Sequence, residues 1–157
     1  LLNIYYVNGG REYMTVHKQG SYLSQTNYGF NRGDSVVLLT DGIKDTDGKA
    51  GAEIIVNVAG TSVQVIHDKD KTTRSYRING SSWQILGYSD LDGIPGNEIV
   101  IKNGNYINAI NDASYLIKNL FVSSSYWTFN TFQNVDGRAG NEVLVSVAGK
   151  PQIITYQ

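Results

Sequence analysis

The sequence has no cysteine among its 157 residues, and it has only two prolines and one methionine. The lack of cysteine excludes disulfides, thiol catalysis and thiolate metal sites. Long apolar runs are also missing, because none approaches the roughly 20 residues of a membrane-spanning helix. Neither sign of charge dominates, since 13 basic and 14 acidic residues give a net charge of -1. Nucleic acid and anionic membranes therefore lack their main electrostatic attraction, and we expect neither as a partner.

Turn-forming residues are abundant instead. The 17 glycines, together with many Asn, Ser and Thr residues, indicate short strands and tight turns, because Gly and Asn tolerate the positive φ angles of turns. Eleven tyrosines and many β-branched residues favour strands. We expect an all-β fold in one domain that spans residues 1-157.

A nine-residue pattern occurs three times without a gap. The copies, which we call the first, second and third Asp-Gly loops, are Asp45-Thr-Asp-Gly-Lys-Ala-Gly-Ala-Glu53, Asp90-Leu-Asp-Gly-Ile-Pro-Gly-Asn-Glu98 and Asn134-Val-Asp-Gly-Arg-Ala-Gly-Asn-Glu142. They begin 45 and then 44 residues apart, and an apolar run follows each one. A period of this length is typical of supersecondary units that stack in a row or a ring.

Positions outside the loops keep the same register. Seven residues before the second and third loops stand Trp83 and Trp127, which we expect to pack between neighbouring units. Each apolar run leads to a turn glycine, at Gly60, Gly104 and Gly149. Seven residues after these glycines stand His67, Asn111 and Tyr156. A site shared by every repeat favours a structural role for His67 over catalysis.

Between loops, the sequence divides into four short segments rich in β-branched and aromatic residues. In the best-defined unit they are Glu53 to Ala59, Ser62 to His67, Thr73 to Ile78 and Ser82 to Tyr88. Four strands per unit predict a β-propeller of four-stranded blades, with units at about 1-50, 51-96, 97-140 and 141-157, the last incomplete. A β-trefoil, which also has units of about four strands, is the alternative.

The predicted strands amount to about three and a half blades. Because a half blade leaves an open sheet edge that invites pairing, we expect one of two arrangements. Either the segment belongs to a longer chain, or two copies form a homodimer that closes a seven-bladed ring.

The Asp-x-Asp-Gly-x-x-x-x-Glu loop followed by an Ile/Val strand resembles the loop of FG-GAP and VCBS repeats, which are found in integrin-type propellers, lectins and bacterial surface proteins. The resemblance covers three loops and, by register, essentially the whole chain. It implies that the protein is secreted or bound to the cell surface, and that its location is therefore extracellular.

The resemblance also implies calcium as a cofactor, because in this family loop positions one, three, five and nine often supply oxygen ligands. The corresponding carboxylate and amide residues here are Asp45, Asp47 and Glu53; Asp90, Asp92 and Glu98; and Asn134, Asp136 and Glu142. Position five departs from the family, since it holds Lys49, Ile94 and Arg138. The favoured reading is therefore structural, with Asp capping the turn and Glu anchoring the loop. If a loop binds calcium, we expect it to be the second.

Motifs of enzymes are missing from the sequence. It contains no G-x-S-x-G, Walker or His-x-x-x-His pattern, and its paired carboxylates occur in the repeated loops. We therefore expect no enzyme.

The first hypothesis for the function is a non-catalytic, lectin-like recognition module that binds carbohydrate. The alternatives are a structural or protein-binding propeller segment of a larger exported protein, and an accessory domain of a hydrolase.

The many Tyr and Asn residues support carbohydrate binding, because aromatic faces stack on sugars and amides hydrogen-bond their hydroxyl groups. We expect exposed residues on outer strands and turns to contact the ligand. The candidates are Tyr22, Tyr28, Asn105, Tyr106, Tyr115 and Tyr126.

Overall fold

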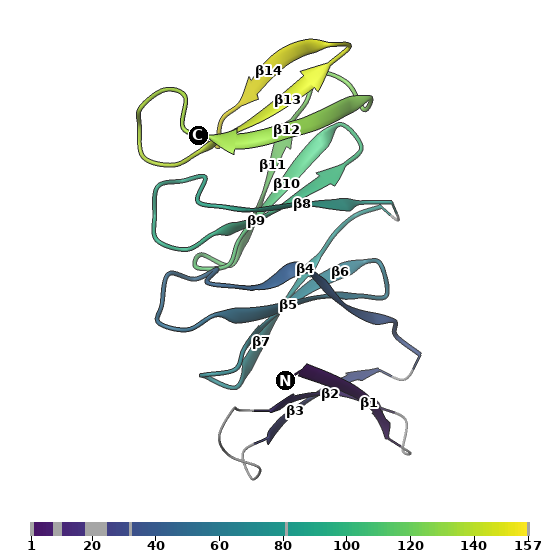
Figure 1. Ribbon diagram of the computed structural model, residues 1–157. Coiled ribbons are helices and arrows are strands. Elements are labelled where there is room, and N and C mark those ends of the chain that lie inside the picture. The colour runs from purple at the N-terminus through teal and green to yellow at the C-terminus, as the bar shows by residue number, and fades with distance from the viewer. Residues whose placement is uncertain (1, 8–10, 18–24, 32, 81, 157) are drawn as a thin grey trace.

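The computed structural model describes residues 2–7, 11–17, 25–31, 33–80 and 82–156, and in these ranges it is built from β-strands without a helix. The fourteen strands form four antiparallel sheets, stacked one above another in Figure 1. Sheet I contains β1 (Leu2–Val7), β2 (Arg11–His17) and β3 (Gln25–Asn31). Sheet II contains β4 (Val36–Lys44), β5 (Glu53–Val58), β6 (Ser62–His67) and β7 (Thr72–Arg77). Sheet III contains β8 (Gln84–Ser89), β9 (Glu98–Asn103), β10 (Tyr106–Asn111) and β11 (Leu116–Phe121). Sheet IV contains β12 (Trp127–Gln133), β13 (Glu142–Val147) and β14 (Lys150–Ile154).

The all-β prediction is confirmed, and each Asp-Gly loop is a hairpin loop within one sheet. The first loop joins β4 to β5, which pair directly, and the other two join β8 to β9 and β12 to β13. The strand before each loop therefore lies in the same sheet as the strands after it. As a result, the sheets are offset by one strand from the repeat units at 1-50, 51-96, 97-140 and 141-157.

Three hydrophobic clusters fill the spaces between successive sheets. Neighbouring residues of β5 point into different clusters: Ile54 and Val56 face sheet I, whereas Ile55 faces sheet III. Because side chains alternate along a strand, a strand between two covered faces needs apolar residues at every position. The apolar runs of β5 and β9, which lie in the two inner sheets, have this cause.

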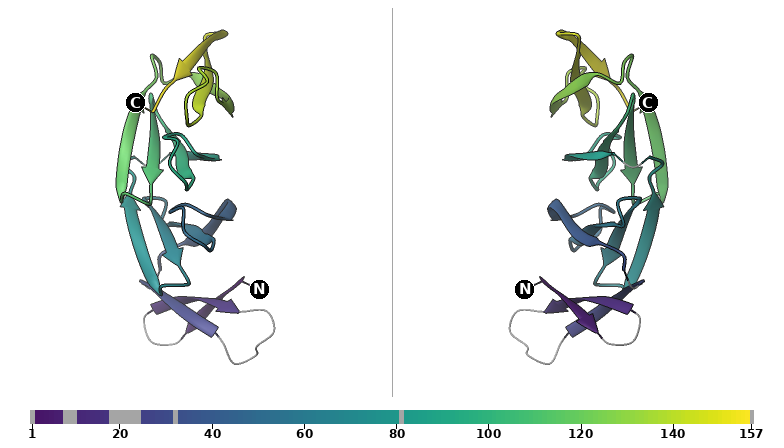
Figure 2. Two further views of the ribbon diagram at one scale, coloured as in Figure 1. Left: turned by 90° about the vertical axis from the view of Figure 1, so that its left-hand side faces the viewer. Right: turned by 90° about the vertical axis from the view of Figure 1, so that its right-hand side faces the viewer.

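The sheets form a curved row, with β7 and β11 on its convex side (Figure 2). On the concave side, the backbones of β4 and β8 approach within 8 Å of one another. Within the described ranges the strands make separate sheets and no closed barrel, which a β-trefoil requires. The described residues contain no helix long and apolar enough to cross a membrane.

Two tryptophans connect successive sheets. The indole Nε1 of Trp83 donates a 2.8 Å hydrogen bond to the carbonyl of Gly60, and Nε1 of Trp127 donates a 2.9 Å bond to the carbonyl of Gly104. Trp83 immediately precedes β8 and Trp127 begins β12, so each bond joins the start of one sheet to a turn of the preceding sheet. The predicted packing of these residues between units is confirmed.

Candidate functional site: the Asp-Gly loops and the cleft between sheets

The three loops repeat one set of hydrogen bonds. The side chain at position one accepts from the amide of position four, at 2.7, 2.6 and 2.8 Å in the three loops. Asp at position three accepts from the amide of position five, at 3.0, 2.8 and 2.9 Å. Glu at position nine accepts from the amide of position two, at 2.8, 2.7 and 2.8 Å. The predicted capping and anchoring contacts are therefore present in all three loops.

The loops also lie against one another, and they form the column at the left of Figure 1. The amide of Asn97 in the second loop donates to the carbonyl of Asp45 in the first at 3.0 Å, and Asn141 donates to Asp90 at 2.8 Å. Gly48 has φ +71°, and a Cβ atom there would lie 2.1 Å from the carbonyl oxygen of Pro95. Glycine is required at this position both by its backbone conformation and by the neighbouring loop.

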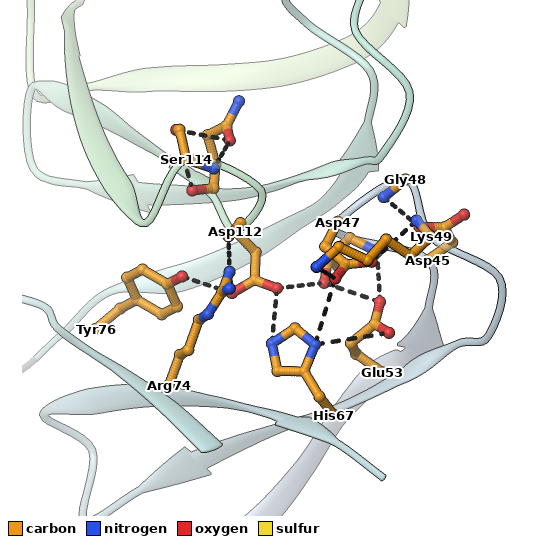
Figure 3. Close-up of polar contacts among 12 residues, drawn as sticks. Asp45, Asp47, Gly48, Lys49, Glu53, His67, Arg74, Tyr76, Asp112 and Ser114 are labelled. Carbon is orange, nitrogen blue, oxygen red and sulfur yellow. Dashed lines mark hydrogen bonds and ion pairs between the residues drawn. The ribbon is translucent and has the colours of Figure 1, made fainter. Parts of the chain in front are cut away.

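A buried polar cluster lies beside the first loop (Figure 3). His67, at the end of β6, is 4% exposed, and three carboxylates surround its ring. Its Nδ1 atom lies 3.6 Å from Oδ2 of Asp47 and 3.8 Å from Oε1 of Glu53. Burial raises the pKa of Glu53. Burial also acts to raise the pKa of Asp47, but hydrogen bonds and attraction from Lys49 lower it overall.

The third carboxylate comes from sheet III. Asp112 follows β10 and is completely buried, with Oδ2 lying 3.1 Å from Nε2 of His67. Its Oδ1 accepts a 2.5 Å hydrogen bond from the hydroxyl of Tyr76, and the guanidinium of Arg74 lies 3.5 Å from the same oxygen. Burial and the bond to Asp112 raise the pKa of Tyr76. Asp112 therefore ties the first loop and β7 of sheet II to the neighbouring sheet.

The second loop has a different partner at the position of His67. Because β5–β6 and β9–β10 pair in the same way, Asn111 occupies the place of His67. Its Nδ2 donates to Oδ2 of Asp92 at 2.8 Å and to Oε1 of Glu98 at 2.9 Å. Burial raises the pKa of Glu98 to about 7. The loop that the sequence favoured for calcium thus has its two inner carboxylates already bridged by an amide.

Tyr156 does not occupy the position shared by His67 and Asn111. Ile154 pairs with Val143 as Ile110 pairs with Ile99, so the residue after Ile154 is the equivalent of Asn111 and Tyr156 is the equivalent of Asp112. The prediction failed because the turn before β14 places its glycine second, whereas the turn before β10 places it first. The Lys118 ammonium donates to the carbonyl of Tyr156, as Arg74 donates to that of Asp112.

A separate cleft of about 400 Å³ opens between sheets II and III. Four asparagines, Asn79, Asn103, Asn108 and Asn119, line it together with Arg77, Ile78, Tyr106 and Ile117. Asn103 donates to Asn108 at 2.9 Å, and Asn108 donates to Asn119 at 2.5 Å, so the amides form a row across β9, β10 and β11. The ring of Tyr106, 43% exposed, stands at this cleft and meets Phe121 edge to face at 5.7 Å.

The predicted ligand-binding residues do not form one site. Tyr106 lines the cleft, and the partly buried Asn105 is its neighbour in the chain. Tyr115 and Tyr126 are exposed, by 57% and 89%, but neither lines the cleft. The expected exposure of Tyr28 is wrong: Tyr28 is 8% exposed because its ring packs in the cluster between sheets I and II and its hydroxyl donates to Asp68 at 2.6 Å. Tyr22 lies outside the described residues.

Sequence reasoning missed Asp112 and the row of asparagines. Asp112 reads as an ordinary turn residue, since its partners Tyr76 and His67 lie in another sheet, 36 or more residues away. A repeated signal was present, because Tyr28 and Asp68 form the same contact one unit earlier.

No protein-family model, curated protein or solved structure gives a significant match to this chain. The resemblance to FG-GAP and VCBS repeats therefore remains a prediction.

Proposed function

We propose that this chain is a segment of a β-propeller and acts as a non-catalytic recognition module that binds carbohydrate in the cleft between sheets II and III. The observation that carries this proposal is the row of Asn103, Asn108 and Asn119 beside the exposed ring of Tyr106. The curved row of sheets, of which the two inner ones have four strands each, supports the propeller.

The chemistry of the cleft suits a neutral sugar. An amide offers both donors and acceptors, and Asn119 is exposed on the outer strand β11, where its amide can reach a ligand. An aromatic ring at the rim offers an apolar face for the C–H side of a pyranose. Among the described residues that line the cleft, Arg77 alone is charged, and its guanidinium can donate hydrogen bonds to sugar hydroxyl groups.

The experiment is a glycan array followed by calorimetric titration of the sugars that bind. Asn119→Asp keeps the oxygen that accepts from Asn108 and removes an amide donor, so we expect affinity to fall by about 2- to 10-fold. Tyr106→Ala should reduce affinity further. Tyr126→Ala is the matched control, because this exposed tyrosine does not line the cleft. An array without binders, or equal losses for Tyr106→Ala and Tyr126→Ala, would contradict the proposal.

A second candidate function is protein binding by the convex side. Leu116 and Phe121 are 61% and 57% exposed, and both lie on the edge strand β11. Exposed apolar residues together with an open edge offer both side-chain and backbone contacts to a partner strand. Leu116→Lys should abolish such binding and leave sugar binding unchanged, which separates the two functions in a pull-down and a titration on the same variant.

Closure of a ring by two copies of the chain is one of the two arrangements that the sequence predicts, and light scattering tests it. The described strands number fourteen, but they are distributed over four sheets. Two copies would therefore supply eight sheets to a ring, not the seven expected from a half blade. Membership of a longer chain is the other arrangement that the sequence predicts. A strictly monomeric species at high concentration would exclude closure by a dimer.

A further inference from the structure

We propose that Asp47, Glu53 and His67 bind a divalent transition-metal ion, with zinc as the expected ion, between Nδ1 of His67 and the two loop carboxylates. The proposal is independent of the sugar cleft. It assigns to the first loop a nitrogen-containing site that uses a residue of β6, and it assigns to Asp112 of sheet III the role of holding the imidazole.

The distances around His67 fit a shared ion better than direct hydrogen bonds. Nδ1 lies 3.6 and 3.8 Å from the nearest oxygens of Asp47 and Glu53, whereas hydrogen bonds span about 2.7–3.2 Å. Two ligands bound at about 2.0–2.2 Å to one tetrahedral zinc ion lie roughly 3.4 Å apart. The three ligand atoms lie within 4.8 Å of one another, and all three residues are buried.

The second loop provides a comparison within the same chain. There the amide of Asn111 contacts the equivalent carboxylates directly, at 2.8 and 2.9 Å. The corresponding distances from Nδ1 of His67 are longer by almost 1 Å, at 3.6 and 3.8 Å. The repeated loops otherwise share their backbone hydrogen bonds. The difference is therefore local to the contacts between His67 and its carboxylates.

An independent observation also points to a ligand at this position. His67 is 4% exposed, and within the described residues its Nε2 has no hydrogen-bond partner, although Oδ2 of Asp112 lies 3.1 Å away. A histidine that binds a metal through one nitrogen commonly donates from the other to a carboxylate. A small rotation of the ring toward an ion at Nδ1 would align Nε2–H with Asp112.

The ligand set selects the kind of ion. Calcium prefers six to eight oxygen ligands, whereas imidazole suits zinc and its neighbours among the transition metals. Three buried carboxylates, Asp47, Glu53 and Asp112, face the ring. A dication balances the charge of two of them, and the guanidinium of Arg74, 3.5 Å from Asp112, offsets the third. Lys49, whose ammonium lies 3.1 Å from Oδ2 of Asp47, is 64% exposed and can turn outward to solvent.

The experiment measures metal content and cobalt spectra of the full chain after chelator treatment. Dialysis against Zn²⁺ should leave about one zinc per chain, and Co²⁺ should give the visible absorption of a nitrogen- and oxygen-ligated site. His67→Asn should lose both signals and remain folded, because Asn111 occupies the same position in the neighbouring sheet. Asp112→Asn should weaken zinc binding by about 10- to 100-fold.

Controls at the second loop separate this site from adventitious binding. Asp92→Asn should leave zinc content unchanged, because its carboxylate belongs to the loop bridged by Asn111. The proposal is overturned if the wild-type chain retains neither zinc nor cobalt, if His67→Asn binds zinc with unchanged affinity, or if equimolar Ca²⁺ displaces the zinc.

Discussion

Replacement of Asp112 by alanine is expected to lower the free energy of unfolding by about 3–5 kcal/mol, the range for removing one partner of a buried ion pair. Asp112 is fully buried and accepts hydrogen bonds from Tyr76, at 2.5 Å, and from Thr46, at 3.2 Å. The alanine variant would leave both hydroxyl groups without this acceptor. It would also leave Arg74, whose guanidinium lies 3.5 Å from Asp112, without its carboxylate.

A double-mutant cycle of Asp112 and Tyr76 separates the contribution of their hydrogen bond from the rest of the loss in unfolding free energy. Tyr76→Phe removes the hydroxyl alone and should cost about 1–3 kcal/mol, because a hydrogen bond to a charged group is lost while the apolar ring stays in place. Residues in direct contact are not additive. The double variant should therefore be less destabilised than the sum of the single variants, by about 1 kcal/mol or more. Asp70→Ala is the matched control, since Asp70 is exposed in the turn between β6 and β7.

The assay is urea denaturation followed by tryptophan fluorescence. Trp83 and Trp127, the only tryptophans of the chain, both connect neighbouring sheets, so their emission reports loss of the stacking between sheets. A loss below about 1 kcal/mol for Asp112→Ala would refute the reasoning, because it would mean that the desolvation of the carboxylate cancels its hydrogen bonds.

Three further predictions concern the loops. Burial raises the pKa of Glu98 from 4.5 to about 7, so the folded chain holds a proton that the unfolded chain releases. Stability should therefore fall by about 2 kcal/mol as the pH rises from 4.5 to 7, after allowance for solvent screening, and Glu98→Gln should flatten this slope in urea titrations at a series of pH values. Gly48→Ala should cost at least about 3 kcal/mol, because its Cβ meets the Pro95 carbonyl, whereas Gly137→Ala, with a similar φ and nothing within 4 Å, should cost about 1–2 kcal/mol; equal losses in thermal unfolding would contradict the close approach of the loops. Lys49→Ala should tighten zinc binding by several-fold in a competition titration, because it removes the cation beside Asp47; unchanged affinity would show that Lys49 does not compete for this carboxylate.

Local features of the fold could be predicted from the sequence, and features between sheets could not. The loop hydrogen bonds join residues that lie two to seven positions apart, so the residue pattern alone specifies them. The apolar run after each loop was also visible in the sequence, and in β5 it forms a strand with nearly every residue buried. The assignment of the strand before the loop was not, because a hairpin loop and a connection between units can have the same composition.

The side chains that complete each loop site come from two adjacent positions outside the loop. In sheet II these positions hold His67 and Asp68, in sheet III they hold Asn111 and Asp112, and in sheet IV they hold Thr155 and Tyr156. The first position faces the carboxylates of its own loop, and the second contacts the preceding sheet. The environment of the first loop is therefore completed by two sheets, because Asp112 of sheet III reaches His67 and Thr46 of sheet II. A repeat whose loops share the same backbone hydrogen bonds can in this way form an imidazole site at one junction and an amide bridge at the next.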